Sequence, residues 1–493
     1  MRAQDSLWLS LDRPANRLHI TSVLWTEGPV DPVQLREIVA DRILARFPVY
    51  LERWVPHRLP GRHPMWETDP DFELGRHLVV RDMPAPGDAR ALQDYVAAER
   101  SKPLDPLHPL WSIHLLRGYG TGDAVVFRSH HAMADGIRLT QVMFSLLDPL
   151  GATAAPPARV GGRAPHRPPA PHPVGELTAT ALRAVGRTSA WLQDAARRAG
   201  PIAEAAVALP AFGASAAVGA TGAAVDLATS RLPAPVRDVV DRLAIAGLTV
   251  WHSGEGILKL VGRAETAAWQ GRPGEEKTAA WGEPVPLETV RRIARATDAT
   301  VNDVCTTLVA GAVDRYLAEH GTAGRQREMT WMIPVSLERF DTRLPETLGN
   351  HFALVLARLP LLRNGFSERL TEVHRSITHI RDSYEPLVNL GLQTLVSQSP
   401  PPVAAALIRY FTDKAVGVLT NVPGPREPMA LAGAKVAGVV GWAPCSGRQA
   451  ITVCIFSYAD GIFFGFGTDR QLIPDPEHLV AALEAEVAAA PAA

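Results

Sequence analysis

Residues 129–136 read Ser-His-His-Ala-Met-Ala-Asp-Gly, and this stretch says most about the fold and the chemistry of the chain. The apolar run 124–127 leads into it and predicts a strand, whereas the apolar positions of 137–147 recur as they do in a helix. Two adjacent histidines at a strand end, followed by an Asp-Gly turn, would hold an imidazole in one orientation. A general base needs such a fixed ring, so the stretch is a candidate for a catalytic histidine, although histidines also serve structural roles.

The composition is that of an ordinary globular protein with enough apolar material for a large core. The chain has 493 residues, of which 46% are hydrophobic and 20% charged, and this length allows two to four domains. The formal net charge of -1 gives no basic surplus that would attract nucleic acid or anionic lipid. We therefore expect no nucleic-acid partner.

The cysteines and the first residues bear on the compartment. The spacing of the three cysteines fits neither a zinc site nor a disulfide framework, which predicts no metal site and favours a reducing compartment. Residues 1–6 lack the apolar core of a signal peptide, so we expect a cytoplasmic protein. The three cysteines are Cys305, Cys445 and Cys454.

One segment raises the question of a membrane span. Residues 205–225 carry no charge, and their length nearly suffices to cross a bilayer. They are rich in Ala and Gly and contain Pro210, and such residues contribute little transfer free energy. This favours a soluble or surface-associated helical segment, with an integral membrane protein as the rival interpretation.

The chain divides into three parts. Residues 1–150 and 254–493 mix predicted strands and helices without a regular βαβ alternation, which indicates an α+β fold rather than a doubly wound sheet. Residues 151–253 begin as a Pro-rich linker and continue as an Ala-rich, helix-prone crossover. Local signals predict helices at 32–43 with Asp31 as cap, 91–98, 287–293, 301–312 with Thr300 as cap, and 479–487, and strands at 111–116, 124–127, 329–333, 352–359, 450–457 and 462–467.

Several short segments besides the doubled histidine occur in a characteristic order. Together they resemble the wax ester synthase/diacylglycerol acyltransferase family, which belongs to the chloramphenicol-acetyltransferase-like superfamily. The resemblance covers both halves and fails mainly between 151 and 254. One departure is Glu338, where the family often has Arg, with Arg339 directly after it. The segments are Pro-Leu-Trp at 109–111, Asn-Asp at 302–303, Pro-Val-Ser-Leu at 334–337, Leu-Gly-Asn at 348–350, Asn-Val-Pro-Gly-Pro at 421–425, Ser-Tyr at 457–458, Asp469, and Pro-Asp at 474–475.

The resemblance implies an architecture and a reaction. Two acyltransferase-like domains would face each other, with a tunnel at their interface and His131 in its middle. Long-chain acyl-CoA would serve as co-substrate, with no further cofactor. Acyl transfer to diacylglycerol would give triacylglycerol, and transfer to a fatty alcohol would give a wax ester. Because such substrates partition into membranes, we expect peripheral association with the inner membrane face or with lipid droplets.

The resemblance also assigns roles within the motif. His131 would deprotonate the acceptor hydroxyl, which then attacks the thioester directly. Asp135 would make a structural salt bridge rather than act as a relay partner. Gly136 would allow a tight turn and close approach of the substrate. His130 either orients the site or packs at the strand end.

Three further residues keep two interpretations each. Asn302 either donates a hydrogen bond toward the oxyanion or to the loop near His131, or it bonds only to local backbone. For Trp111 and Asp303 the resemblance suggests substrate binding. The residues themselves favour a core tryptophan and a charge at a helix terminus.

Two other functions fit parts of this pattern. A condensation-type or polyketide-associated acyltransferase shares the doubled histidine, although the segments 109–111 and 302–303 argue against it. A noncatalytic lipid-binding homologue would keep the fold, although the intact His131, Asp135 and Gly136 argue against it.

Overall fold

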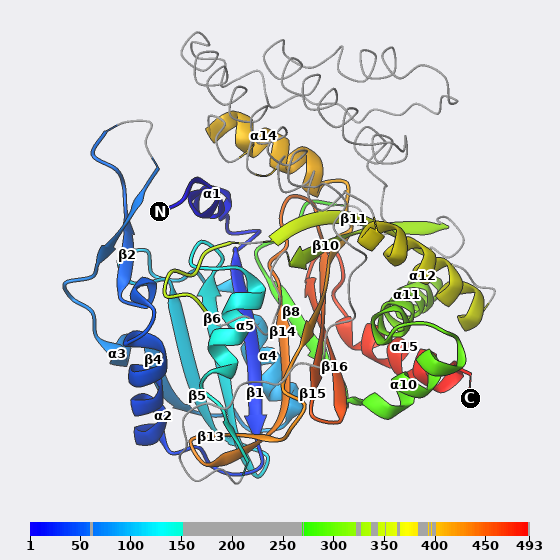
Figure 1. The fold of residues 1–493 in the computed structure, drawn as a ribbon, viewed down its shortest axis with the longest axis horizontal. Helices are drawn as coiled ribbons and strands as arrows, with labels where there is room; N and C mark the ends of the chain where they lie inside the picture. Colours follow the sequence, from blue (N-terminus) through cyan, green and yellow to red (C-terminus); the bar gives the residue numbers. More distant parts are fainter. Residues whose placement is uncertain are drawn as a thin grey trace, which may run out of the picture.

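Two seven-stranded sheets stand side by side in the computed structural model (Figure 1). The structure describes residues 1–59, 63–150, 269, 271–321, 327–336, 344–350, 352–361, 365–382, 393, 396 and 401–491. We call the first sheet with its helices the N-lobe and the second the C-lobe. The linker and crossover at 151–253, the segment 205–225, and the Glu338 and Arg339 pair lie outside the described residues.

The N-lobe sheet contains the strand that carries the doubled histidine. Its order is β4-β5-β6-β1-β14-β13-β7, and all neighbours are antiparallel except β4 and β5. A separate two-stranded ribbon joins β2 (Glu52–Val55) and β3 (Met65–Thr68). The sheet strands are β4 (Leu78–Asp82), β5 (Trp111–Tyr119), β6 (Gly122–His130), β1 (His19–Thr26), β14 (Ala434–Trp442), β13 (Met429–Leu431) and β7 (Asp148–Pro149).

The C-lobe sheet has the order β11-β10-β12-β15-β16-β8, with β9 also paired to β16. Strands β12 and β15 are parallel, so the chain must cross over between them. The strands are β11 (Phe352–Pro360), β10 (Glu328–Ser336), β12 (Gly417–Pro423), β15 (Ile451–Tyr458), β16 (Gly461–Asp469), β8 (Lys277–Trp281) and β9 (Val285–Pro286).

The crossover that follows β12 carries the chain into the other lobe. Strands β13 and β14 leave the C-lobe and join the N-lobe sheet, where Thr21 of β1 pairs with Trp442 of β14. A Cβ on Gly424, at the start of this crossover, would clash with the carbonyl oxygen of Ser457, so the close passage needs glycine. The division of the chain at residue 254 therefore does not follow the sheets.

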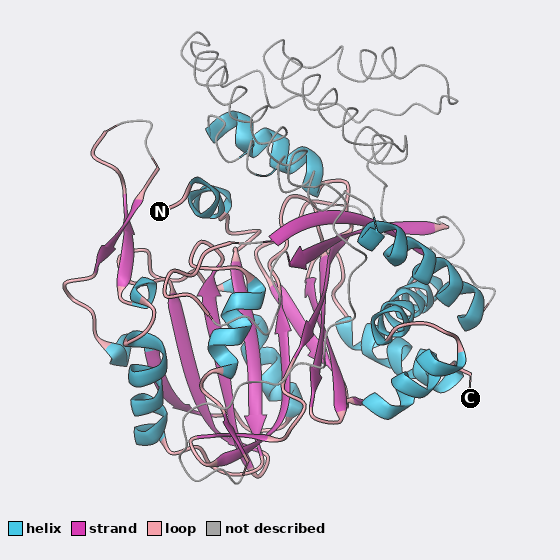
Figure 2. Ribbon diagram, in the orientation of Figure 1, coloured by secondary structure: helices cyan, strands magenta, loops and turns pink. Residues whose placement is uncertain are grey.

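Helices cover the two lobes unequally (Figure 2). The helices at 287–319, 366–382 and 476–489 gather beside the C-lobe sheet, whereas the helix at 401–412 contacts the N-terminal helix. Helix α4 of the N-lobe packs against both β1 and the C-lobe strand β8. The helices are α1 (Ala3–Leu11), α2 (Pro32–Val39), α3 (Leu74–His77), α4 (Ala89–Ser101), α5 (Gly136–Phe144), α10 (Leu287–Ala296), α11 (Val301–Glu319), α12 (Phe366–Asp382), α14 (Pro401–Thr412) and α15 (Pro476–Ala489), with a π-helix at Ala40–Leu44 and a 3-10 turn at Pro48–Tyr50.

Local sequence signals placed these elements well, and the predicted α+β class is confirmed. The Asp31 side chain caps α2 by accepting a hydrogen bond of 2.8 Å from the backbone N–H of Val33. Thr300 and Asp303 form a reciprocal capping box at the start of α11. Among the described residues, no helix is both long and apolar enough to cross a bilayer.

Candidate active site

The doubled histidine lies where β6 ends and the turn to α5 begins. His130 of β6 pairs with His19 of β1, and the backbone N–H of His131 donates to the Leu18 carbonyl at 2.8 Å. Asp135 then caps α5 by accepting a hydrogen bond of 2.9 Å from the backbone N–H of Arg138. The turn is therefore fixed by a sheet ladder on one side and a helix cap on the other.

The His131 ring is enclosed by aromatic side chains. It stacks on Trp8 of α1 with 4.2 Å between ring centroids, and Phe352 of β11 lies 5.5 Å away. Only 7% of the residue is exposed. This burial lowers the pKa of His131 to about 4, and hydrogen bonding to its own backbone and to Asn350 partly opposes the effect. The imidazole is therefore neutral at pH 7 and able to accept a proton.

Asn350 of the C-lobe ties the turn to the opposite half of the molecule. Its amide nitrogen donates to the His131 carbonyl at 3.0 Å and to Asp5 of α1 at 2.9 Å. Beside it, Gly349 bridges to Ala134, and its carbonyl accepts from the Asp135 N–H at 3.3 Å. Both lobes and the N-terminal helix thus meet at His131.

The segment at 348–350 belongs to the family resemblance but carried no predicted role, and Trp8 was not among the predicted site residues. For the segment at 348–350, the available sequence signal was a polar Asn350 directly after Gly349. In the structure Gly349 has a φ of +110°, which favours glycine. Nothing local in the sequence places Trp8 on His131, because that contact depends on how α1 packs.

His130 and Gly136 serve the turn in different ways. Nδ1 of His130 accepts a hydrogen bond of 3.0 Å from the Ala132 N–H, and its ring lies edge-on to His19. Position 136 does not require glycine for its backbone conformation, because an added Cβ would meet only Ile20 Cδ1 at an ordinary 3.7 Å. The tight turn expected at Gly136 is therefore not what requires glycine there, and close approach of a substrate stays a prediction.

Asn302 and Asp303 both hold the start of α11. Asn302 accepts a hydrogen bond of 2.9 Å from the Asn421 side chain, and the hydrogen bonds of the described residues include none between Asn302 and His131. Asp303 is 1% exposed, and its Oδ2 accepts from the Thr300 N–H at 2.9 Å and faces His374 Nδ1 at 2.8 Å. These contacts are structural, so the oxyanion role of Asn302 and the substrate role of Asp303 stay predictions.

Trp111 lies in the N-lobe core. It is 2% exposed, its indole N–H donates to the Tyr50 carbonyl at 2.8 Å, and it stacks on His77. This position agrees with packing, and a contact of Trp111 with substrate stays a prediction.

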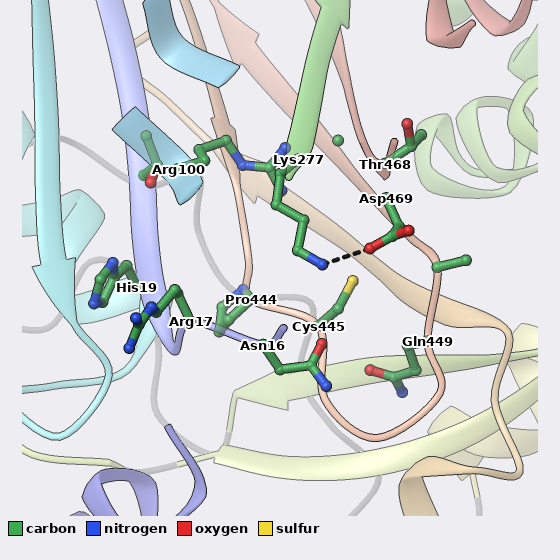
Figure 3. Close-up of a pocket in the computed structure, with 13 residues that line it drawn as sticks. Asn16, Arg17, His19, Arg100, Lys277, Pro444, Cys445, Gln449, Thr468 and Asp469 are labelled. Carbon is green, nitrogen blue, oxygen red and sulfur yellow. Dashed lines mark hydrogen bonds and ion pairs between the residues drawn. The ribbon is translucent and has the colours of Figure 1, made fainter. Parts of the chain in front are cut away.

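A polar pocket lies between the lobes, near His130 (Figure 3). Its wall includes the start of β1, the last turn of α4, the start of β8, the end of β16 and the segment after β14. His19, which contacts the His130 ring, is part of this wall. We call this cavity the interlobe pocket.

Comparisons with solved structures define the class of fold. A wax ester synthase/diacylglycerol acyltransferase from Marinobacter aquaeolei superposes with a TM-score of 0.64 at 19% identity, over 98% of this chain and 96% of that one. The first condensation domain of the CDA synthetase gives a TM-score of 0.52 at 18% identity, over 100% and 96%. The two-lobed architecture with the doubled histidine is thus the chloramphenicol-acetyltransferase-like fold.

Family models identify the branch within that class. The wax ester synthase/diacylglycerol acyltransferase catalytic domain matches residues 1–238, and the C-terminal domain of the same family matches residues 348–489. The chain belongs to this family of acyltransferases. A probable diacylglycerol O-acyltransferase of Mycobacterium tuberculosis is 26% identical over 86% of this chain and 81% of its own length. The O-acyltransferase WSD of Acinetobacter baylyi is 23% identical over 98% and 95%.

Proposed function

We propose that the protein transfers a long-chain acyl group from acyl-CoA to a lipid hydroxyl, with His131 as the general base. The observation that carries this proposal is the buried, neutral His131 ring, held by both lobes at the meeting point of α1, β6 and residue 350. The names of the relatives favour diacylglycerol or a fatty alcohol as the acceptor.

The reaction requires a base because an alcohol does not ionise near neutral pH. The imidazole of His131 takes the hydroxyl proton while the oxygen attacks the thioester carbonyl, and a tetrahedral intermediate forms. Collapse of this intermediate expels CoA as a thiolate, which takes the proton from the imidazolium. Burial disfavours the imidazolium, so the proton passes on readily and the ring returns to its neutral form.

Both substrates must reach His131 at the junction of the lobes. A tunnel between the lobes, entered by acyl-CoA and acceptor from opposite sides, would bring them together there. The acceptor and the acyl chain partition into lipid, so we place the protein on the cytoplasmic face of a membrane or on a lipid droplet, in peripheral contact.

The test compares the unchanged protein with His131→Ala, using palmitoyl-CoA and either dioleoylglycerol or hexadecanol. Released CoA is titrated and the lipid products are resolved. Loss of the base should lower kcat by about 10²–10⁴-fold. The matched control is His478→Ala, because His478 of α15 is 54% exposed at its side chain and should leave kcat unchanged.

Each result has a stated meaning. Triacylglycerol or wax ester from the unchanged protein, lost in a folded His131→Ala variant, supports the proposal and identifies the acceptor. Equal turnover in that variant removes His131 as the base. No product with either acceptor overturns the proposed acceptor class and favours a condensation-type substrate or a noncatalytic lipid-binding role.

A further inference from the structure

Arg100 is a cation without a matching anion at the boundary between the lobes. It lies in the last turn of α4, donates to the Thr278 carbonyl of β8 and places its guanidinium 5.4 Å from the Trp442 ring centroid. Among the described residues, no carboxylate pairs with it. Desolvation without an ion pair is costly for a guanidinium, and burial lowers the pKa of Arg100 to about 10.

The neighbouring strand leaves space for this side chain. A Cβ added to Gly467 of β16 would lie 2.5 Å from Nη1, 2.6 Å from Nη2 and 2.7 Å from Cζ of Arg100. Any side chain at position 467 would therefore displace the guanidinium. The fold accommodates Arg100 at a site where no carboxylate of the described residues neutralises its charge.

The interlobe pocket collects two more cations (Figure 3). Arg17, Arg100 and Lys277 line it, whereas Asp469 is the one carboxylate in its described wall. Lys277 Nζ bonds to Asp469 at 2.7 Å, which satisfies that carboxylate. Arg17 lies 3.7 Å from Asp12, beyond hydrogen-bond length, and its buried Nε has no hydrogen-bond partner among the described residues. The wall of the pocket is therefore electropositive.

His19 adds a neutral donor to this wall. Its Nδ1 lies 3.4 Å from Arg128 Nη2, and a guanidinium can only donate, so Nδ1 is the acceptor. The hydrogen of the neutral ring is then on Nε2, which is buried and has no hydrogen-bond partner within the described part of the chain.

The positions of the ring hydrogens also bear on a possible metal site beside the pocket. Asp12, His19 and His130 lie close enough together to hold one. However, Nδ1 of His130 accepts from the Ala132 N–H, so both histidines carry their hydrogen on Nε2. Ligation through Nε2 would require both rings to move this hydrogen to Nδ1 and give up these hydrogen bonds, which disfavours a metal ion at this group.

We propose that the interlobe pocket binds a phosphate group of the acyl-CoA donor, through Arg17, Arg100 and Lys277. This inference rests on the proposed function for its donor. Charge-assisted hydrogen bonds from guanidinium groups suit phosphate oxygens in particular. A phosphate held there would anchor the donor at the junction of the lobes, with the pantetheine arm left to span the distance to the thioester.

The experiment compares three donors on the unchanged protein and on Arg100→Gln. Palmitoyl-CoA carries all phosphates, palmitoyl-dephospho-CoA lacks the 3'-phosphate, and palmitoyl-pantetheine lacks them all. We expect Arg100→Gln to raise KM for palmitoyl-CoA about ten-fold or more, with a much smaller change for palmitoyl-pantetheine. Arg100→Lys should recover part of the loss. The matched control is Arg90→Gln, because Arg90 lies on the same helix but is exposed and paired with Asp94.

An equal rise of KM for palmitoyl-CoA and palmitoyl-pantetheine would overturn the proposal, because it would make Arg100 a merely structural residue. Free inorganic phosphate is the other ligand of this chemistry that the pocket could bind. Two results together would assign the pocket to free phosphate and overturn the CoA assignment. Phosphate would raise the melting temperature of the unchanged protein but not that of Arg100→Gln, and the three donors would have identical KM values.

Calorimetric titration with CoA separates this inference from the proposed function. If CoA binds and Arg100→Gln weakens that binding about ten-fold, while no acyl transfer occurs, the phosphate site stands and the proposed reaction fails. If acyl transfer occurs and Arg100→Gln leaves CoA affinity unchanged, the proposed reaction stands and the phosphate site fails.

Discussion

The two histidines of the turn are neighbours in the chain but lie in opposite surroundings. His131 is stacked on Trp8 and faces Phe352, so apolar rings exclude water from it. His130 lies 3.7 Å from Asp12 and contacts His19, which lines the pocket that also contains the three cations. One turn thus joins an aromatic enclosure, which keeps an imidazole neutral, to a polar region suited to recognition of an anion.

The two surroundings are also stabilised by different forces. Packing and desolvation dominate around His131, whereas buried charges paired on one face of β6 support the region of His130. Arg128 of β6 and Glu99 of α4 are 4% and 3% exposed, and they pair at 3.0 Å. Variants on each side should therefore fail in different ways.

The largest expected effect is on the polar side. Glu99→Gln leaves the buried Arg128 guanidinium without its carboxylate, which should lower the free energy of unfolding by about 3–5 kcal/mol. Urea unfolding followed by circular dichroism measures it. Asp82→Asn is the control, because Asp82 pairs with Arg117 at the surface and such pairs contribute less than about 1 kcal/mol. Equal losses in both variants would contradict the proposed difference between buried and exposed pairs.

On the aromatic side, Asn350→Leu should impair both catalysis and the fold. The substitution keeps the number of side-chain heavy atoms but leaves the His131 carbonyl and the Asp5 carboxyl without their donor. Each orphaned acceptor costs about 1–3 kcal/mol, and we expect kcat to fall about 10–100-fold. Steady-state kinetics and a melting curve check both. An unchanged kcat in a protein of lower melting temperature would reduce Asn350 to a structural residue.

The pH profile sharpens the comparison further. The base must be unprotonated, and burial lowers the pKa of His131 to about 4, so kcat should stay level from pH 8 to about pH 5.5. An ordinary histidine would lose half its activity near pH 6.5. Trp8→Ala should expose the ring, raise its pKa and move the acidic limb to higher pH. A limb near pH 6.5 in the unchanged protein would contradict the enclosure.

The same pKa has a consequence for stability, with a definite sign. The unfolded chain binds a proton at His131 near pH 6.5, whereas the folded protein binds it only near pH 4. This residue therefore withdraws stability as the pH falls from about 6.5 toward 4. His131→Ala should flatten that part of the profile of melting temperature against pH, and an unchanged slope would argue against the low pKa.

The smallest expected effect concerns Asn302. Asn421→Ala removes an exposed hydrogen bond to Asn302 and should change kcat less than about three-fold, because surface substitutions shift free energies by about 0.5 kcal/mol. Steady-state kinetics of Asn302→Ala, measured in parallel, decide whether Asn302 stabilises the oxyanion. A loss of 10² or more in that variant alone would make Asn302 an oxyanion donor rather than a structural residue.

Elements set by neighbouring residues could be predicted from the sequence. The caps at Asp31 and Thr300 and the strand at 124–127 depend on side chains within a few residues, and all three were confirmed. The enclosure of His131 could not be predicted in the same way. Asn350 and Trp8 reach it only because the lobes and α1 pack together. The unpaired charge of Arg100 likewise appears only once β8 and β16 surround it.

Because β13 and β14 belong to the N-lobe sheet, that sheet can be completed only late in protein synthesis. A ribosome releases β1 early, yet the partner on its open edge is β14, near the far end of the chain. Until Ala434–Trp442 emerges, the N-lobe has a bare hydrogen-bonding edge, the kind that recruits other chains into aggregates. The protein must therefore remain protected for nearly the whole of its translation before its first sheet can be completed.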